Sequence, residues 1–307
     1  MDLTKLKTYS LKKRKSKVKL AEFAQVCRKG GSFVEFYQSL PKILAADNLH
    51  KVTEAIVKSA KAKKPVIFMA GAHVIKCGLN PLVIDLIRRK VITAVVLNGA
   101  GIIHDFEIAY AGYTSEDVGQ AIKDGSFGMA RETAEFINNA ISEGNNRGWG
   151  IGRSVGEAIG EARLPHRDLS ILYNALKYHV PVSVQVAIGT DIIHQHPSCD
   201  GAAIGEASLR DFHQLIEQVA KLEKGVLLNF GSAVILPEVF LKALTVARNL
   251  GNKVKDFTTS NFDMIYHYRP AQNVVSRPTQ GTGKGYYIVG HHEIMLPLLA
   301  RLIIEKL

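Results

Sequence analysis

The sequence predicts an α/β fold built on a doubly wound, mostly parallel, Rossmann-like sheet with an N-terminal helical extension. Short, continuously apolar runs alternate with longer segments whose apolar residues recur at helical spacing. Continuous apolar runs are typical of strands that are buried on both faces of a parallel sheet. No internal repeat or low-complexity linker divides the chain beyond residue 20. These observations favour one large domain rather than two.

The N-terminal region is predicted to be helical over residues 19–62. Apolar residues recur every three to four positions between residues 20 and 40, with an interruption at Gly30 and Gly31. A second helix is expected over residues 43–62, before Pro65 starts the alternating part of the chain.

Six apolar runs are predicted to be strands, with helices between them. The strands are expected at residues 66–70, 92–97, 181–189, 225–231, 262–268 and 286–290. The helices are expected at residues 80–89, 115–143, 169–178, 209–222, 237–250 and 295–306. Ligands of doubly wound sheets bind beyond the carboxyl ends of the strands, so the residues that follow each strand are the candidates for a site.

The composition excludes several classes of protein. Apolar residues make up 47% and charged residues 22% of the 307 residues, as in ordinary globular proteins. No apolar run reaches 18 residues, and the first apolar stretch is too short and too charged for a signal peptide. Three cysteines without a CxxC pair exclude a disulfide scaffold. We therefore expect a cytoplasmic protein that does not bind a membrane.

Residues 1–20 are predicted to form a basic arm, and residues 21–307 a single domain. The arm has eight Lys or Arg residues and one acid, Asp2, so it carries +7 of the net charge of +11. Such an arm can bind nucleic acid or an acidic surface, or it can simply be solvated. Only Tyr9 interleaves an aromatic ring with these charges, so we do not expect a nucleic-acid partner.

Seven of the eleven histidines closely follow predicted strands, and we expect them to meet at one edge of the sheet. They are His73, His104, His194, His196, His267, His291 and His292. A first interpretation is a dinucleotide site, because the turn Asn98-Gly99-Ala100-Gly101 would let a backbone approach phosphates closely. The same turn is also compatible with a plain strand-to-helix connection.

Two other interpretations stay open for these strand ends. His194 and His196, with Asp191 and Asp200, have the residue types and close spacing of divalent metal ligands. Histidines beside Asp105 or Asp191 would equally suit acid–base chemistry on a bound substrate.

A second glycine-rich segment, residues 280–285, contains Lys284. A lysine on such a turn can contact phosphate, and a desolvated lysine can carry a substrate as an imine. A solvated lysine on a turn is the alternative.

The stretch from residue 66 to residue 105 resembles the deoxyhypusine synthase family. That family has a strand, a TSN-x-x-SSG turn with a helix, and a second strand that ends in TAGG-x-EED, with the spacing found here. Gly231-Ser232-Ala233-Val234 resembles the family's GGG-V turn, and Leu296-Pro297-Leu298-Leu299 resembles its FPLL helix start. The resemblance covers most of the chain from about residue 17.

The resemblance implies a Rossmann-like domain that binds NAD at the carboxyl ends of the strands. It also implies dehydrogenation of a small-molecule amine, spermidine in the family, and transfer of the aminobutyl group through an active-site lysine. Homospermidine synthases are relatives that use another acceptor. The family is a homotetramer with sites at a dimer interface, and its N-terminal arm can cover a neighbouring active site.

Carried over to this chain, the resemblance and the strand-end pattern together predict three sets of residues. The NAD-binding residues are expected to be Ala72, His73, Asn98, Gly99, Ala100, Gly101, Asp105, Gly231, Ser232, Ala233, His291 and His292. Catalysis is expected from Lys284, His104 and Asp191. Substrate contacts are expected from His194, His196, Tyr268 and Glu293.

The sequence departs from the family at a residue that matters for a polyamine. The family's two glutamates fall on Ile103 and His104, so an expected anion for a cationic substrate is missing. This loss argues against deoxyhypusine synthesis itself. The leading hypothesis is therefore an NAD-dependent enzyme acting on an amine. A metal-dependent hydrolase or lyase on the same fold is one alternative, and a non-catalytic protein with a basic arm is the other.

Overall fold

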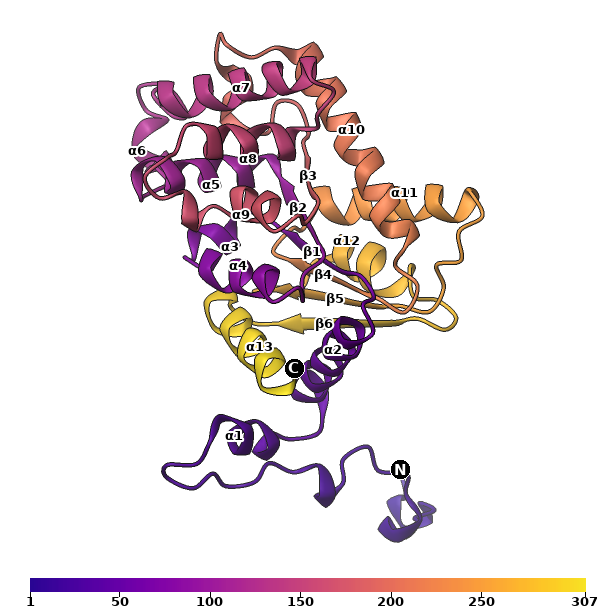
Figure 1. The fold of residues 1–307 in the computed structure, drawn as a ribbon. Helices are drawn as coiled ribbons and strands as arrows, with labels where there is room; N and C mark the ends of the chain where they lie inside the picture. The colour runs from indigo at the N-terminus through magenta and orange to yellow at the C-terminus, as the bar shows by residue number, and fades with distance from the viewer.

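The computed structural model describes residues 1–307 and is organised around one parallel sheet. Its strands are β1 (Val66–Ala70), β2 (Ala94–Asn98), β3 (Val182–Gln185), β4 (Val226–Phe230), β5 (Thr258–Asp263) and β6 (Lys284–Val289). Their order across the sheet is β3-β2-β1-β4-β5-β6, and every neighbouring pair is parallel (Figure 1). This order is that of a doubly wound Rossmann-like sheet, so the predicted fold class is confirmed.

Helices cover both faces of the sheet. They are α1 (Phe33–Ser39), α2 (Leu44–Lys61), α3 (His73–Lys76), α4 (Asn80–Arg88), α5 (Gly99–Ala111), α6 (Val118–Ala121), α7 (Arg131–Asn146), α8 (Ile151–Glu161), α9 (Ile171–Lys177), α10 (Gly201–Ala220), α11 (Ile235–Asn249), α12 (Tyr268–Pro270) and α13 (His292–Lys306). A π-helical turn follows α12 at Ala271–Ser276, and short 3₁₀ turns occur at Leu3–Lys5, Leu11–Lys13, Leu20–Glu22, Arg167–Leu169 and Ile192–Gln195. No helix has the length and apolar content needed to cross a membrane.

The two faces of the sheet carry two separate hydrophobic cores. Side chains alternate between the faces along each strand. Phe68 and Phe230 join the larger core with α2, α4, α5, α8, α9 and α13, whereas Ile67 and Leu227 join the smaller core beneath α10 and α11. Because both faces are covered, β1, β2 and β4 are almost entirely buried, which explains their continuous apolar sequences.

The fifth strand lies earlier in the chain than its sequence suggests. The strand predicted at residues 262–268 shares only Phe262 and Asp263 with β5, because the rest of β5 consists mainly of buried polar residues. The amide of Asn229 on β4 donates to Asn261 Oδ1 at 2.6 Å, which lets a polar side chain occupy an interior strand. The apolar residues Ile265 and Tyr266 instead lie exposed beyond the end of the strand.

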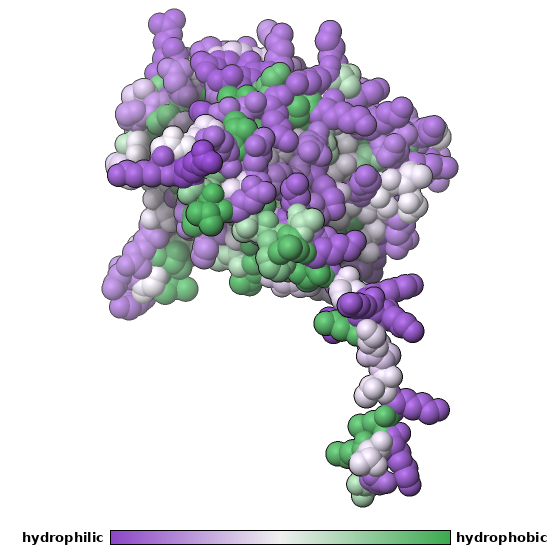
Figure 2. Space-filling view, turned by 90° about the horizontal axis from the view of Figure 1, so that it is seen from below, coloured by the Kyte–Doolittle hydropathy of each residue, from purple (hydrophilic) through white to green (hydrophobic).

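The N-terminal region is less helical than its apolar pattern suggests. Only a 3₁₀ turn forms between residues 19 and 32, and the helix predicted over this segment is wrong. Leu20, Phe23 and Val26 are exposed and have no core to pack against. Figure 2 shows the N-terminal arm projecting from the body, with hydrophilic and hydrophobic residues interleaved.

The predicted helix at residues 115–143 is two helices, α6 and α7. Gly125 and Gly128 lie between them with positive φ, a backbone conformation that ends a helix and favours glycine. Helix α8 was not predicted. Its sequence has five small residues, among them Gly152 and Gly156, which allow the helix to approach other backbones closely.

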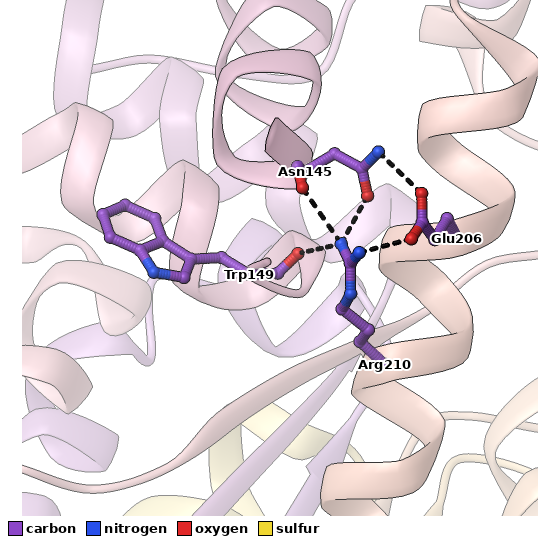
Figure 3. A network of polar contacts seen from close by, with 4 residues as sticks. All are labelled: Asn145, Trp149, Glu206 and Arg210. Carbon is purple, nitrogen blue, oxygen red and sulfur yellow. Dashed lines mark hydrogen bonds and ion pairs between the residues drawn. The ribbon is translucent and has the colours of Figure 1, made fainter. Parts of the chain in front are cut away.

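A polar network ties α10 to the turn between α7 and α8 (Figure 3). Arg210 donates to the backbone oxygen and the side-chain oxygen of Asn145, at 3.2 and 2.5 Å, and to the backbone oxygen of Trp149 at 3.4 Å. Two guanidinium groups lie over the ring of Trp149, with Cζ of Arg147 at 5.0 Å and Cζ of Arg153 at 4.3 Å from the ring centroid. The network fixes this turn against α10.

Candidate functional site

The strand order reverses between β1 and β4, and a crevice is expected at their carboxyl ends. Gly71 follows β1 and Gly231 follows β4. The Gly71 N–H donates to Phe230 O at 2.9 Å, and a Cβ added to Gly71 would lie 2.7 Å from Gly231 O. Gly231 has a φ of +65°. The two turns therefore pass each other without room for side chains, with Gly71 buried and Gly231 partly exposed.

His292, at the start of α13, packs against the turn after β4. Its side chain is 1% exposed, and neither ring nitrogen has a hydrogen-bond partner. The ring centroid lies 5.7 Å from that of His73 and 5.9 Å from that of Phe230. Burial lowers the pKa of His292, although Asp263 opposes the shift. Two unpartnered polar atoms in a buried position are what a bound ligand would satisfy.

A cavity of about 200 Å³ lies beyond the ends of β2 and β3. Helix α5 contributes Ala100, His104 and Glu107, the loop after β3 contributes Asp191, and α3 contributes Lys76. Two of the three predicted catalytic residues, His104 and Asp191, therefore line the same cavity. Helix α3 connects the two parts of the site, because it carries His73 at the crevice and Lys76 at the cavity.

Asp191 is a buried carboxylate without a full set of partners. Its side chain is 9% exposed, and Oδ2 has no hydrogen-bond partner. A Cβ added to Gly99, the first residue of α5, would lie 1.9 Å from Oδ2, so glycine is required there. Burial raises the pKa of Asp191 to about 6. The Asp191 N–H donates to His194 Nδ1 at 3.3 Å, so His194 shapes the loop that presents this carboxylate.

His104 is oriented by a chain of hydrogen bonds. Its Nδ1 lies 2.6 Å from Thr114 Oγ1, and the Thr114 hydroxyl donates to Glu107 Oε2. A hydroxyl has one proton to donate, so the imidazole must donate from Nδ1 and keep Nε2 as a proton acceptor. Burial lowers the pKa of His104, and the nearby Glu107 opposes this shift. The arrangement holds a neutral imidazole as a base at the cavity.

The proton of neutral His104 is expected on Nδ1, and replacing Thr114 with valine is expected to move it to Nε2. Valine has the size of threonine but cannot accept the Nδ1 proton. Ring ¹⁵N chemical shifts of His104, measured by NMR above the pKa, distinguish the two tautomers. Thr114→Ser is the matched control, since it keeps the hydroxyl. An Nε2-protonated ring in the unaltered protein would contradict this assignment.

Asp105 does not reach the site, which corrects its expected role as an NAD contact. The carboxylate is fully buried and accepts from Ser170 Oγ at 2.6 Å, from Ile171 N at 2.7 Å and from Leu172 N at 3.2 Å. It therefore holds the N-terminus of α9. Burial raises the pKa of Asp105 to about 6, and these hydrogen bonds oppose the shift.

Two other predicted NAD contacts act as helix caps at the edge of the site. Asn98 Oδ1 accepts from Gly101 N at 3.0 Å at the start of α5, and Ser232 Oγ accepts from Leu236 N at 3.2 Å at the start of α11. Ala100 in the first turn of α5 and Ala233 in the turn before α11 both lie close to the carboxyl ends of the strands.

Lys284 lies at the opposite edge of the sheet. It is the first residue of β6 and pairs with Thr258, the first residue of β5, so it sits at the amino end of the strands. There it lines a hollow of about 660 Å³ together with Lys51, Lys58 and Lys224. The expectation that Lys284 joins His104 and Asp191 is therefore not met within one chain, because its glycine-rich turn precedes a strand instead of following one.

The predicted metal ligands do not gather around one point. His196 Nδ1 lies 2.8 Å from Ser198 Oγ, Asp200 caps α10 through Ala202 N at 2.9 Å, and His194 accepts backbone N–H groups. No group of three or more His, Cys, Asp or Glu side chains is placed to hold a metal ion. The metal alternative thereby loses its set of ligands.

The remaining predicted substrate contacts lie outside the cavity. Tyr268 is 67% exposed at the start of α12. Glu293 and His291 form an exposed pair at the start of α13, with Oε1 and Nδ1 3.7 Å apart.

Sequence reasoning missed Thr114 and Glu116, which lie on a loop after a helix. The sequence does offer a way to find Lys76 and Glu107. Each lies three residues after a histidine that follows a predicted strand, so each shares a helix face with that histidine.

No protein-family model matches the chain, and a search of curated proteins finds no relative. Solved structures do share its architecture. A candidate deoxyhypusine synthase from Entamoeba histolytica is 12% identical, with a TM-score of 0.56 over 90% of this chain and 94% of that one. The likeness shows a related fold. It does not by itself establish family membership.

Two other similar structures come from longer proteins. AgrE, in a ternary complex with ornithine and NAD⁺, is 15% identical with a TM-score of 0.51, over 84% of this chain and 32% of AgrE. ArgZ, an arginine dihydrolase from the ornithine-ammonia cycle in Cyanobacteria, is 17% identical with a TM-score of 0.52, over 86% of this chain and 33% of ArgZ. This chain thus spans about a third of either protein.

Proposed function

We propose that this chain is an NAD-dependent enzyme that dehydrogenates a small amine to an imine. The observation that carries the proposal is the adjacency of two sites. The turns at the point of strand reversal, beside the unpartnered His292, and the cavity lined by a neutral base and a buried carboxylate share the carboxyl-end edge of the sheet. Helix α3 is common to both, so ligands in the two sites would lie side by side.

The residues of the crevice fit a dinucleotide. Gly71 and Gly231 let the turns after β1 and β4 pack closely, and a Cβ at Gly231 would lie 2.5 Å from His292 Nε2 and would block that nitrogen. His73 and His292 would contact the ligand through their ring nitrogens, and the turn from Gly231 to Ala233 through its backbone. When bound, NAD⁺ supplies the acceptor for the hydride that leaves the substrate carbon.

The cavity residues supply the remaining chemistry. Asp191 Oδ2 holds the ammonium group of the substrate, because an ionised carboxylate without partners gains most from a cationic donor. His104 Nε2 takes a proton from that nitrogen, which leaves an amine lone pair to assist loss of hydride from the adjacent carbon. Glu107 and Thr114 keep the imidazole in the tautomer that this step requires.

The comparisons support this proposal by analogy of fold. AgrE was solved with NAD⁺ and ornithine, an amine, together, and another neighbour is a candidate deoxyhypusine synthase. The homotetramer, the cytoplasmic location, aminobutyl transfer through Lys284 and a role for the basic arm stay predictions from the sequence.

Titration of the purified chain with NAD⁺ by calorimetry tests the cofactor assignment. We expect saturable binding with a Kd in the micromolar range. Ala233→Glu, which places an anion on the turn after β4, is expected to weaken binding at least about tenfold, because it repels the phosphates. The matched control Ala202→Glu places the same charge at the exposed start of α10 and is expected to bind normally. Absence of binding by the unaltered chain would overturn the proposal.

A further inference from the structure

The charges that line the 200 Å³ cavity are unequally satisfied. Five ionisable side chains face it: Lys76, His104, Glu107, Glu116 and Asp191. Three of them are engaged with the protein itself. His104 and Glu107 share Thr114, Glu107 also accepts from Thr133 Oγ1 at 3.1 Å, and Glu116 accepts from Gly128 N at 2.9 Å.

Two charges of opposite sign are left without partners. The side chain of Lys76, an exposed residue at the end of α3 that lines the cavity, makes no hydrogen bond or ion pair with another residue. Asp191 Oδ2 is buried and also has no partner. The two groups come from different elements, α3 and the loop after β3, so the cavity presents a cation on one wall and an anion on another. A ligand that satisfies both must itself carry an anionic group and a cationic group, and an amino acid carries both, as a carboxylate and an ammonium group.

The net charge of the side chains that line the cavity places a second constraint on the ligand. Three carboxylates and one lysine, with His104 neutral, give a net charge of +1 − 3 = −2. An amino acid with a neutral side chain would leave that charge in place, whereas a second cationic group on the side chain would compensate part of it. The volume lies below the roughly 300–1,000 Å³ of sites for drug-sized ligands, so the ligand is small.

We propose that the cavity binds a basic amino acid, with its carboxylate on Lys76 and its amino group on Asp191. The proposal names the substrate class of the proposed function and rests on it for the reaction, but not for binding. It distinguishes the substrate from a polyamine, which lacks the carboxylate that Lys76 would pair with and would bring another cation against that lysine.

Matched ligands that differ by one carboxylate test the proposal. Ornithine, lysine and arginine are titrated by calorimetry against 1,4-diaminobutane, 1,5-diaminopentane and agmatine, each with and without NAD⁺. We expect at least one amino acid to bind about ten- to hundredfold more tightly than its amine, as one charge-assisted contact would give. Lys76→Met is expected to remove this preference by weakening amino-acid binding, without weakening amine binding. The matched control Lys253→Met replaces an exposed lysine that does not line the cavity, and it should keep the preference for the amino acid.

Each outcome decides the proposal. Equal or tighter binding of the amines, retention of the preference in Lys76→Met, or failure of all six ligands to bind under both conditions would overturn it. The NAD⁺ titration is read separately. Amino-acid binding with the Lys76-dependent preference but without NAD⁺ binding would uphold this inference and overturn the proposed function alone.

Discussion

Asp191→Asn is expected to raise the free energy of unfolding at pH 8 by about 3 kcal/mol and to abolish binding of amines to the cavity. Burial raises the pKa of Asp191 from 3.8 to about 6, a difference of about 2.2 units. Each unit corresponds to about 1.4 kcal/mol. Above pH 6 the folded protein must keep an unfavourable buried charge, which asparagine removes while preserving the shape of the side chain.

The gain in the free energy of unfolding on Asp191→Asn is expected to depend on pH. Between pH 3.8 and about 6 the folded state binds more protons at Asp191 than the unfolded state does, so this group lowers stability as the pH rises. The advantage of the variant is therefore full above pH 6 and disappears below pH 4. Thermal unfolding from pH 4 to pH 8 measures it, with Asp200→Asn as a control because asparagine also caps helices well. A pH-independent difference between variant and parent would contradict the assignment.

Asp105→Ala is expected to destabilise the protein by about 3 kcal/mol and to leave NAD⁺ affinity unchanged. The substitution strands the N–H groups of Ile171 and Leu172 and the hydroxyl of Ser170 in the interior, and each buried group without a partner costs about 1–3 kcal/mol. Part of this loss of stability is offset, because the variant no longer has to bury a charged carboxylate.

Urea unfolding and NAD⁺ titration of the folded variant separate the two roles of Asp105. Asp85→Ala serves as a control, since Asp85 forms partly exposed ion pairs with Arg88 and Arg89 that are worth about 1 kcal/mol or less. A variant with unchanged stability but weakened NAD⁺ binding would restore the role that the sequence suggested for Asp105.

Much of the fold could be predicted because burial on both faces of a sheet leaves a direct trace in the sequence. The apolar runs at β1, β2 and β4 and the helical spacing in α4 and α11 agree with the structure to within a few residues. Strand β5 was placed wrongly because Asn261 pairs with Asn229 of the neighbouring strand inside the sheet. A hydropathy pattern does not reveal such pairing of polar side chains. The exposed segment around Phe23 looked helical because apolar spacing does not say whether a core is available.

The candidate site could be predicted where it depends on topology. His104 and Asp191 follow neighbouring parallel strands, and the carboxyl ends of such strands meet at one edge. Residues such as Thr114 could not be predicted, because that hydroxyl reaches His104 from a loop whose path depends on tertiary packing. The prediction for Lys284 failed for a different reason. Its glycine-rich turn precedes β6, so Lys284 lies at the amino end of the strand, away from the candidate site.

The setting of Trp149 makes it a built-in optical reporter. It is the only tryptophan in the chain, so its emission comes from a single place, the turn that Arg210 fixes between α7, α8 and α10. Its ring is flanked by Arg147 and Arg153 and lines neither the crevice nor the 200 Å³ cavity. Its fluorescence therefore follows the loss of packing during unfolding, and a change of intensity on adding a ligand would reveal that occupancy at the sheet edge is transmitted to this distant turn.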